Sequence, residues 1–161
     1  MEFLIKAYDD RFRDQIIGLS LRSWEPVFQK LEPAVPAYVY REFYPQGWQA
    51  RQTQDISRIL DTESERVWVA VHGDIVLGWV GVRLHDEDHM GEIYIIAVDP
   101  DHHREGIASA LIAAATDYMR AAGMRIVMVE TGDDPGHVAS RIAYERNGFE
   151  RWPVARYFRE I

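Results

Sequence analysis

The sequence predicts an α/β fold in a single domain over residues 1–161, with a mixed central sheet and flanking helices. Helical spacing of apolar residues dominates from residue 9 to residue 60, and β-type runs follow between residues 66 and 98. A strand–helix–strand unit then leads to the apolar run Ile126–Val129. No repeat or linker divides the chain, and elements in this order pack as layers of helix on sheet around one core.

The first third of the chain is predicted to hold one strand and three helices. Prolines at 33 and 36 separate the first two helices, because proline disrupts a helix interior. The expected elements are a strand over Phe3–Tyr8, a helix capped by Asp9 or Asp10 that runs towards Leu31, and helices over Tyr38–Phe43 and Ala50–Leu60.

The rest of the chain alternates strands with two helices. Strands are expected over Arg66–Val71, Ile75–Leu84, Gly91–Val98 and Ile126–Val129, with a hairpin turn at His72–Asp74 between the first two. One helix ends at Gly123, and another opens at Pro135 and ends at Asn147–Gly148. Two short strands are expected to close the chain.

Composition favours a globular protein that does not bind nucleic acid. The formal net charge is −8 and the hydrophobic content is 47%. Such a protein repels phosphate backbones and attracts cations, which mildly favours an amine substrate. There is no cysteine for a disulfide or a thiolate site, and no apolar run reaches the roughly 20 residues that span a bilayer. The charged start, MEFLIKAYDD, does not resemble a signal peptide, so we expect a cytoplasmic protein with no membrane partner.

A short loop between the central strand and the next helix is the most informative segment. It runs from Asp99 to Ala108, where Pro100 stops the strand and Gly106 lets the backbone approach a ligand closely. The first turn of the following helix has amide groups without intrahelical partners, and the helix dipole favours an anion there. The pattern indicates a pyrophosphate site, and the alternative is a tight strand–helix turn without a ligand.

Two motifs in this order resemble those of the GCN5-related N-acetyltransferase (GNAT) family. His103–Ala108 resembles the pyrophosphate motif Q/R-x-x-G-x-G/A, with His103 in place of Gln or Arg and Arg104 beside it as a substitute charge. Residues 135–149 resemble the second signature, a helix ending in Y-E-x-x-G-F. The hairpin before the motifs and the closing strands fit the same fold, whereas residues 7–64 have no recognisable counterpart. The resemblance implies a mostly antiparallel sheet with a splayed strand pair, acetyl-CoA as co-substrate, and no metal.

The resemblance also implies that main-chain groups bind the cofactor. Those of Ile96, Ala97 and Val98 would hydrogen-bond the pantetheine arm, although their side chains equally suit a core strand. His137 and Arg141 precede Tyr144 by two turns and one turn of helix, so they either meet the cofactor or form a surface network with Glu145. The expected pyrophosphate contacts come from His103, Arg104, Glu105, Gly106, Ile107, Ala108 and Ser109.

Tyr144 is the candidate general acid. Attack of an amine on a thioester ends in expulsion of a thiolate, and a phenol beside the sulfur can donate the proton. Family members often place the tyrosine of Y-E-x-x-G-F there. The alternative is a tyrosine that only packs under the sheet.

Glu92 is the candidate base, because an ammonium group at neutral pH has no lone pair with which to attack. Many family members keep a glutamate at this point of the strand, acting directly or through water. Glu92 and Tyr94 are expected on the same face by strand alternation. The alternative is a solvated carboxylate, and Glu130 is the reserve candidate.

Three aromatic residues in the N-terminal part, Trp24, Tyr44 and Trp48, are candidates for the acceptor pocket together with Tyr94. Family members usually build that pocket in this part of the chain, although aromatic residues at helical spacing are commonly core. The segment His85–His89 combines two histidines with carboxylates, but it has the pattern of a hairpin turn rather than of a helix. A solvated acidic turn is therefore expected there, and not a metal site.

The resemblance leaves the acceptor open. The leading prediction is acetyl transfer to a primary amine of a small molecule, by direct attack within a ternary complex. The alternatives are a protein N-terminus or lysine as acceptor, or a CoA-binding sensor module without catalysis. A homodimer is also expected, because dimers are common in the family.

Overall fold

A five-stranded sheet with the strand order β1-β2-β3-β4-β5 forms the centre of the computed structural model, which describes residues 1–161. Neighbouring strands are antiparallel from β1 to β4, whereas β4 and β5 are parallel. This confirms the predicted mixed, mostly antiparallel sheet. The strands are β1 (Leu4–Ala7), β2 (Val67–His72), β3 (Ile75–His85), β4 (Met90–Val98) and β5 (Ile126–Val129).

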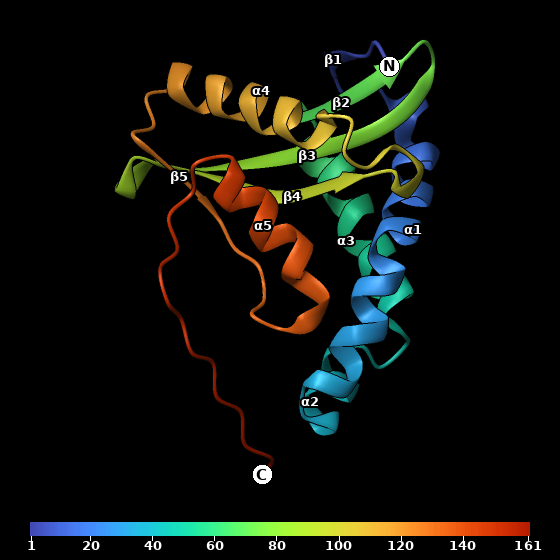
Figure 1. The fold of residues 1–161 in the computed structure, drawn as a ribbon, viewed down its shortest axis with the longest axis vertical. Helices are drawn as coiled ribbons and strands as arrows, with labels where there is room; N and C mark the ends of the chain where they lie inside the picture. The colour runs from blue at the N-terminus through green and yellow to red at the C-terminus, as the bar shows by residue number, and fades with distance from the viewer.

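Helices cover both faces of the sheet (Figure 1). They are α1 (Arg13–Leu31), α2 (Ala37–Phe43), α3 (Trp48–Thr62), α4 (Ile107–Ala121) and α5 (Val138–Arg146). Helices α1 and α3 pack on one face, whereas α4 and the aromatic residues of the α5 segment pack on the other. None of the helices combines the length and the apolar character needed to cross a membrane.

Each face of the sheet has its own buried cluster. On the α1/α3 face Trp79 is fully buried, and its indole N–H donates to the Ser20 hydroxyl at 2.8 Å, so the buried polar atoms are paired. On the α4 face Met119 lies directly over Gly91, where an added Cβ would come within 2.0 Å of its sulfur. Burying a large apolar side chain stabilises a fold by about 1.5–3 kcal/mol, so the two clusters fix both helical layers on the sheet.

The central strand β4 changes partners along its length. It pairs with β5 only from Met90 to Ile93, and the pairing with β3 slips by one residue at Tyr94. The slip is a β-bulge, which bends a strand and increases its twist. Beyond the bulge β4 continues to Val98 while β5 ends at Val129, so the two strands separate as the resemblance implies.

The C-terminal segment differs from expectation. The two predicted closing strands are absent, and residues 150–161 run as an extended segment (Figure 1). The segment returns to α2, where Phe158 meets the Phe43 ring edge-on with ring centroids 5.8 Å apart. Arg151 pairs with Asp133 at 2.8 Å and Arg156 pairs with Glu130 at 3.3 Å. These contacts hold the segment along the loop after β5 rather than against the free edge of β5. Without a neighbouring strand the segment has no ladder, and Pro153 has no amide hydrogen to contribute to one.

Candidate active site

Asp99 connects β4 to the loop that follows it. Its carboxylate accepts from the Asp101 amide at 3.0 Å and so caps the turn Pro100–His102. Its amide donates to the Leu77 carbonyl at 2.8 Å, which ties the loop to β3. Although Asp99 is only 9% exposed, its charge is balanced by the guanidinium of Arg22, which reaches across from α1.

The loop then turns sharply into α4. Arg104 has φ +65° and Gly106 has φ +81°, and the first of these is unusual for a residue with a side chain. The Ala110 amide donates to the Gly106 carbonyl at 3.0 Å, so the three preceding amides, of Ile107, Ala108 and Ser109, have no intrahelical partner. A Cβ built at Gly106 meets nothing within 4 Å, so the loop faces open space at this position. This arrangement fits a phosphate group.

Side chains of the loop are largely bonded within it. The His103 Nε2 atom lies 3.3 Å from the Val98 carbonyl, and His102 Nδ1 lies 3.4 Å from the Glu105 carboxylate. His103, which stands where the family motif has Gln or Arg, therefore contacts the end of β4. The groups of this loop that have no partner within it are the main-chain amides of the first turn of α4 and the side chain of Arg104, which makes no hydrogen bond or ion pair.

Beyond Ile93, where its pairing with β5 ends, β4 has main-chain polar groups that face the gap between the two strands. The Asp99 amide bonds to Leu77, and hydrogen-bonded pairs alternate along an antiparallel ladder. The amide and carbonyl of Ala97 therefore face β3, whereas those of Ile96 and Val98 face the gap. Of the three residues expected to contact pantetheine, Ile96 and Val98 thus have main-chain groups that face the gap, and the Val98 carbonyl lies 3.3 Å from His103 Nε2. Contact of any of the three with the cofactor stays a prediction.

Tyr144 lies on the α4 face, where it packs against the buried cluster and meets the Phe149 ring edge-on at a centroid distance of 6.0 Å. Burial raises the pKa of Tyr144 to about 12. The phenol therefore keeps its proton at neutral pH. A tyrosine in this state is a hydrogen-bond donor rather than a base.

Glu92 lies on the opposite face from Tyr144. Because Gly91 faces Met119 of α4, the next side chain along the strand points to the α1/α3 face, and Tyr94 packs against the cluster on that face. The expected common orientation of Glu92 and Tyr94 is therefore confirmed. The Glu92 side chain is only 18% exposed, and its carboxylate lies 2.7 Å from His85 Nε2.

Arg83 is the third polar residue of this region. It stands directly across the strand pair from Glu92, yet its guanidinium makes two 3.0 Å hydrogen bonds to the Glu63 carboxylate. Its charged carbon also lies 3.4 Å from the centroid of the Tyr94 ring. The ion pair with Arg83 lowers the pKa of Glu63. Because Arg83 bonds to Glu63, the Glu92 carboxylate pairs with His85 instead.

His137 and Arg141 shape the loop that leads into α5. His137 Nδ1 lies 2.6 Å from the Asp134 carboxylate, and Arg141 donates to the carbonyls of Gly132 and Asp134 at 2.7 and 2.9 Å. These partners lie in the loop, and neither residue pairs with Glu145, so the expected surface network with that residue is not formed. A direct contact of His137 or Arg141 with the cofactor stays a prediction.

The three aromatic candidates lie on the α1/α3 side. Trp24 packs against the core cluster of that face. Trp48 stacks on Phe28 with ring centroids 4.5 Å apart, and Tyr44 meets the same ring edge-on at 5.2 Å. Burial raises the pKa of Tyr44. Tyr44 and Trp48 thus form one aromatic group, with Trp24 further into the core.

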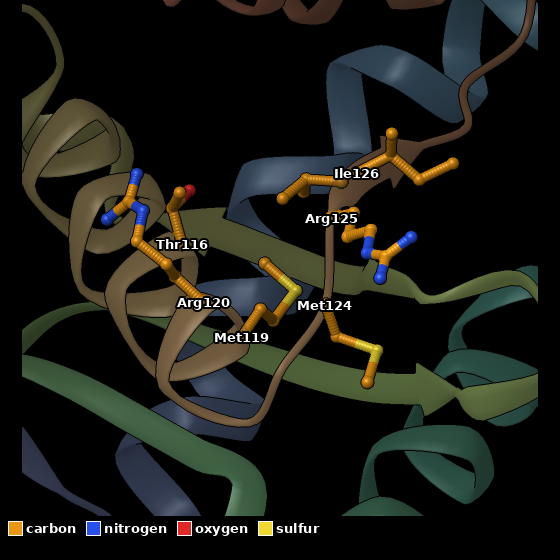
Figure 2. Close-up of a pocket in the computed structure, with 7 residues that line it drawn as sticks. Thr116, Met119, Arg120, Met124, Arg125 and Ile126 are labelled. Carbon is orange, nitrogen blue, oxygen red and sulfur yellow. The ribbon is translucent and has the colours of Figure 1, made fainter.

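Two hollows lie outside this arrangement. One of about 180 Å³ lies at the far end of α4, between Met119, Met124 and Arg125 (Figure 2). The other, of about 320 Å³, lies at the turn between α2 and α3, where it is lined by Phe43 and by the polar residues Arg51 and Asp55. The second is next to the aromatic group, because Arg51 stacks over the Tyr44 ring at 5.6 Å.

The sequence profile of the acetyltransferase (GNAT) family matches residues 24–149. The chain belongs to this family. The match begins within α1, so the part of the chain after residue 24 has a family counterpart, contrary to the expectation that residues 7–64 have none. The splayed strand pair, the loop before α4 and the α5 helix all lie within the residues that match the family.

The curated relatives of this GNAT chain are longer proteins. A mycothiol acetyltransferase from Actinosynnema mirum is 36% identical over 142 residues, which are 84% of this chain and 46% of that protein. A second, from Saccharopolyspora erythraea, is 31% identical over 129 residues, or 75% of this chain and 41% of that protein. The chain spans less than half the length of these relatives.

Solved structures show the same fold at low identity. The aminoglycoside N-acetyltransferase AAC(6')-Iy in complex with CoA is 18% identical with a TM-score of 0.67, covering 99% of this chain and 95% of that one. PH1933 from Pyrococcus horikoshii OT3 is 16% identical with a TM-score of 0.70, covering 96% of this chain and 93% of that one. The GNAT fold is therefore established along nearly the whole chain.

Sequence reasoning missed three polar residues of the site in this GNAT domain: Arg22, Arg83 and His85. Arg83 and His85 alternate with apolar residues at the end of β3, which is the pattern of polar side chains on one face of a strand. That signal was present in the sequence. Arg22 had no such signal, because its partner Asp99 is 77 positions away.

Proposed function

We propose that the chain is an acetyl-CoA-dependent N-acetyltransferase that acetylates a primary amine of a small molecule by direct attack within a ternary complex. The observation that carries the proposal is the gap between β4 and β5. A loop of the phosphate-binding type lies at the end of that gap, and Tyr144 and Glu92, the proposed acid and base, lie on opposite faces of the sheet. Such an arrangement suits a thioester held in the gap and approached by an amine from the α1/α3 face.

Main-chain groups would hold acetyl-CoA. The amides of Ile107, Ala108 and Ser109 suit the pyrophosphate, and the polar groups of Ile96 and Val98 suit the amides of the pantetheine arm. Glycine at position 106 keeps the approach to the amides open. Acetyl-CoA itself supplies the activated acyl group.

Glu92 and Tyr144 would perform the two proton transfers. Glu92 accepts a proton from the acceptor ammonium, which frees the nitrogen lone pair to form the C–N bond. Tyr144 donates from its phenol to the sulfur as the C–S bond breaks. Because the pKa of Tyr144 is raised to about 12, complete transfer to a thiolate is uphill, and stabilisation by a hydrogen bond is the larger part of its role.

Two observations support a small cationic acceptor. The relatives of highest identity given above are mycothiol acetyltransferases. The α1/α3 face also carries aromatic rings beside carboxylates, with Tyr44 and Trp48 near Asp55, a combination that suits an amine with polar substituents.

Thiol release from acetyl-CoA tests the proposal. The 161-residue chain is assayed with a panel of small primary amines, a peptide with a free N-terminus and a peptide with an internal lysine. Turnover with small amines above that with either peptide is expected. Turnover with peptides alone would identify a protein acetyltransferase, and tight CoA binding without turnover on any amine would identify a binding module.

A further inference from the structure

His85 makes a contact with Glu92 that no motif indicated. Glu92 and its cross-strand partner Arg83 stand directly opposite each other, and His85 lies diagonally, two residues further along β3. Arg83 is the stronger cation, but both of its hydrogen bonds go to Glu63. The carboxylate of Glu92 is therefore paired with a group that can lose its charge near neutral pH, instead of with one that cannot.

His85 also connects Glu92 to solvent. Its Nε2 atom contacts the Glu92 carboxylate, which is 18% exposed, and its Nδ1 atom lies 3.9 Å from the carboxylate of Glu87, which is 73% exposed. The charged groups around the imidazole are Glu92 from β4, Glu87 and Asp88 from the turn, and Arg83 from β3, the last neutralised by Glu63. The ring thus lies between a shielded carboxylate and an exposed one.

We propose that His85 is the positioning and proton-relay residue of Glu92, an inference that rests on the proposed acetyl transfer. Neutral His85 and ionised Glu92 together accept one proton from the acceptor ammonium. The products are a neutral amine and an imidazolium paired with the carboxylate, and the proton then leaves at the Nδ1 side. Protonated His85 cannot accept a further proton, so the pair is active only above the pKa of this histidine.

The neighbours of His85 set the direction of its titration. Its hydrogen bond to Glu92, with smaller contributions from Glu87 and Asp88, raises the pKa of His85 above its ordinary value of 6.5. The acidic limb of activity therefore includes a step above pH 6.5 that belongs to this histidine. The acceptor amine titrates as well, but it contributes equally to wild type and variants, so their ratio cancels it.

The test compares His85→Gln with His89→Asn. Glutamine can still donate to Glu92 but does not titrate, and His89 is a second histidine of the same turn whose side chain makes no hydrogen bond or ion pair. With one small amine acceptor, kcat/KM of His85→Gln should be about tenfold below wild type at pH 8.5, part of the 10²–10⁴ that a general base contributes. The deficit should shrink as the pH falls to 6, whereas His89→Asn should match wild type throughout. A deficit in His85→Gln that does not change with pH overturns the relay.

Proton NMR of the imidazole groups supplies a measurement that needs no acceptor. In the wild-type chain His85 should titrate above 6.5, and the Glu92→Gln variant should lower that midpoint while leaving His89 unchanged. A midpoint that Glu92→Gln does not move disproves the pair. If wild type instead releases no thiol with any amine, the proposed function fails whatever the NMR titration shows, so the two failures are distinguishable.

Discussion

The two faces of the sheet offer different parts of the chain to a ligand. On the α4 face the candidate cofactor contacts are main-chain groups, presented by the loop before α4 and by the open side of β4. On the α1/α3 face the candidate acceptor contacts are side chains: the aromatic rings of Tyr44 and Trp48 and the carboxylate of Glu92. Main-chain recognition needs only a backbone shape, whereas side-chain recognition needs particular residues.

This difference predicts which substitutions each face should tolerate. A loop that binds phosphate through amides accepts many side chains, and here it accepts His103, whose ring turns to the Val98 carbonyl. A surface built from rings and ion pairs changes its ligand when any of its residues changes. Cofactor binding on the α4 face (the cofactor face) should therefore change mainly with substitutions that alter the backbone conformation. Acceptor binding on the α1/α3 face (the acceptor face) should change with substitutions of single side chains.

The largest expected effect is that of replacing Tyr144, the candidate acid, which lies on the cofactor face. Tyr144→Phe keeps the packing against Phe149 but removes the donor to sulfur, so kcat should fall by about 10²–10³-fold. Affinity for CoA should be unchanged in a binding titration. Tyr118→Phe is the matched control, because Tyr118 packs in the same cluster against Trp68.

The pKa of Tyr144 fixes the pH dependence of this loss. A folded pKa of about 12 lies above the ordinary value of 10.0, so the phenol stays protonated throughout an assay from pH 6 to 9. The ratio of wild-type to Tyr144→Phe activity should then be constant over that range. A ratio that falls towards pH 9 would mean that Tyr144 loses its proton there, against the effect of its burial.

A glycine pair tests the backbone character of the cofactor face. Gly106 and Gly123 have φ +81° and +88°, and a Cβ at either meets nothing within 4 Å. Alanine at each position should cost about 1 kcal/mol of stability, because both keep a left-handed conformation. Gly106→Ala alone should also weaken CoA binding, by about tenfold, since its methyl group enters the space before the Ile107 amide. Equal CoA affinity in the two variants would remove the loop from the site.

The strand, turn and helix that carry the candidate cofactor contacts could be predicted from sequence, because their signal is local. Pro100, Gly106 and the apolar runs on either side define a strand, a turn and a helix without reference to any distant residue. The strand Ile126–Val129 was likewise predicted at its observed bounds, as an apolar run between turns. Elements of this kind follow from periodicity and backbone preference alone.

The acceptor face could not be assembled from sequence, because its contacts join distant positions. The pairing of Arg83 with Glu63 spans 20 residues, and that of Arg22 with Asp99, which connects α1 to the loop before α4, spans 77. His85 was considered only for a metal site, which the turn pattern excluded. Its contact with Glu92 was missed, because that partner is identified by strand register and not by spacing. The two closing strands failed for a related reason: composition does not decide whether a segment pairs with a sheet edge, and ion pairs of Arg151 and Arg156 hold residues 150–161 away from the free edge of β5.

Arg22 connects α1, on the acceptor face, with the loop before α4. Its loss should therefore weaken the binding of both acetyl-CoA and the acceptor. Arg22→Gln leaves the buried carboxylate of Asp99 without its cation and loosens α1 from the cofactor loop. Because the Arg22 side chain is 56% exposed, we expect a loss of about 0.5–1 kcal/mol, which is about two- to fivefold in the KM of acetyl-CoA and of the acceptor. Arg13 lies on the same helix as Arg22 and pairs with Asp61 of α3 at 2.7 Å, so Arg13→Gln breaks a different ion pair and should leave both KM values unchanged. A rise in only one KM would show that the faces are independent.

The smallest effect is expected at the edge of the acceptor face. Tyr44→Phe keeps the edge-on contact with Phe28 and removes only a hydroxyl, so the KM of the acceptor should rise about twofold, the lower limit for one hydrogen bond of roughly 0.5 kcal/mol. Tyr40→Phe is the control, because Tyr40 contacts the Tyr44 ring from one turn earlier on α2. The KM of acetyl-CoA should not change in either variant. If Tyr44→Phe alters the KM of acetyl-CoA instead, the aromatic group belongs to the cofactor side, and the division of work between the faces is wrong.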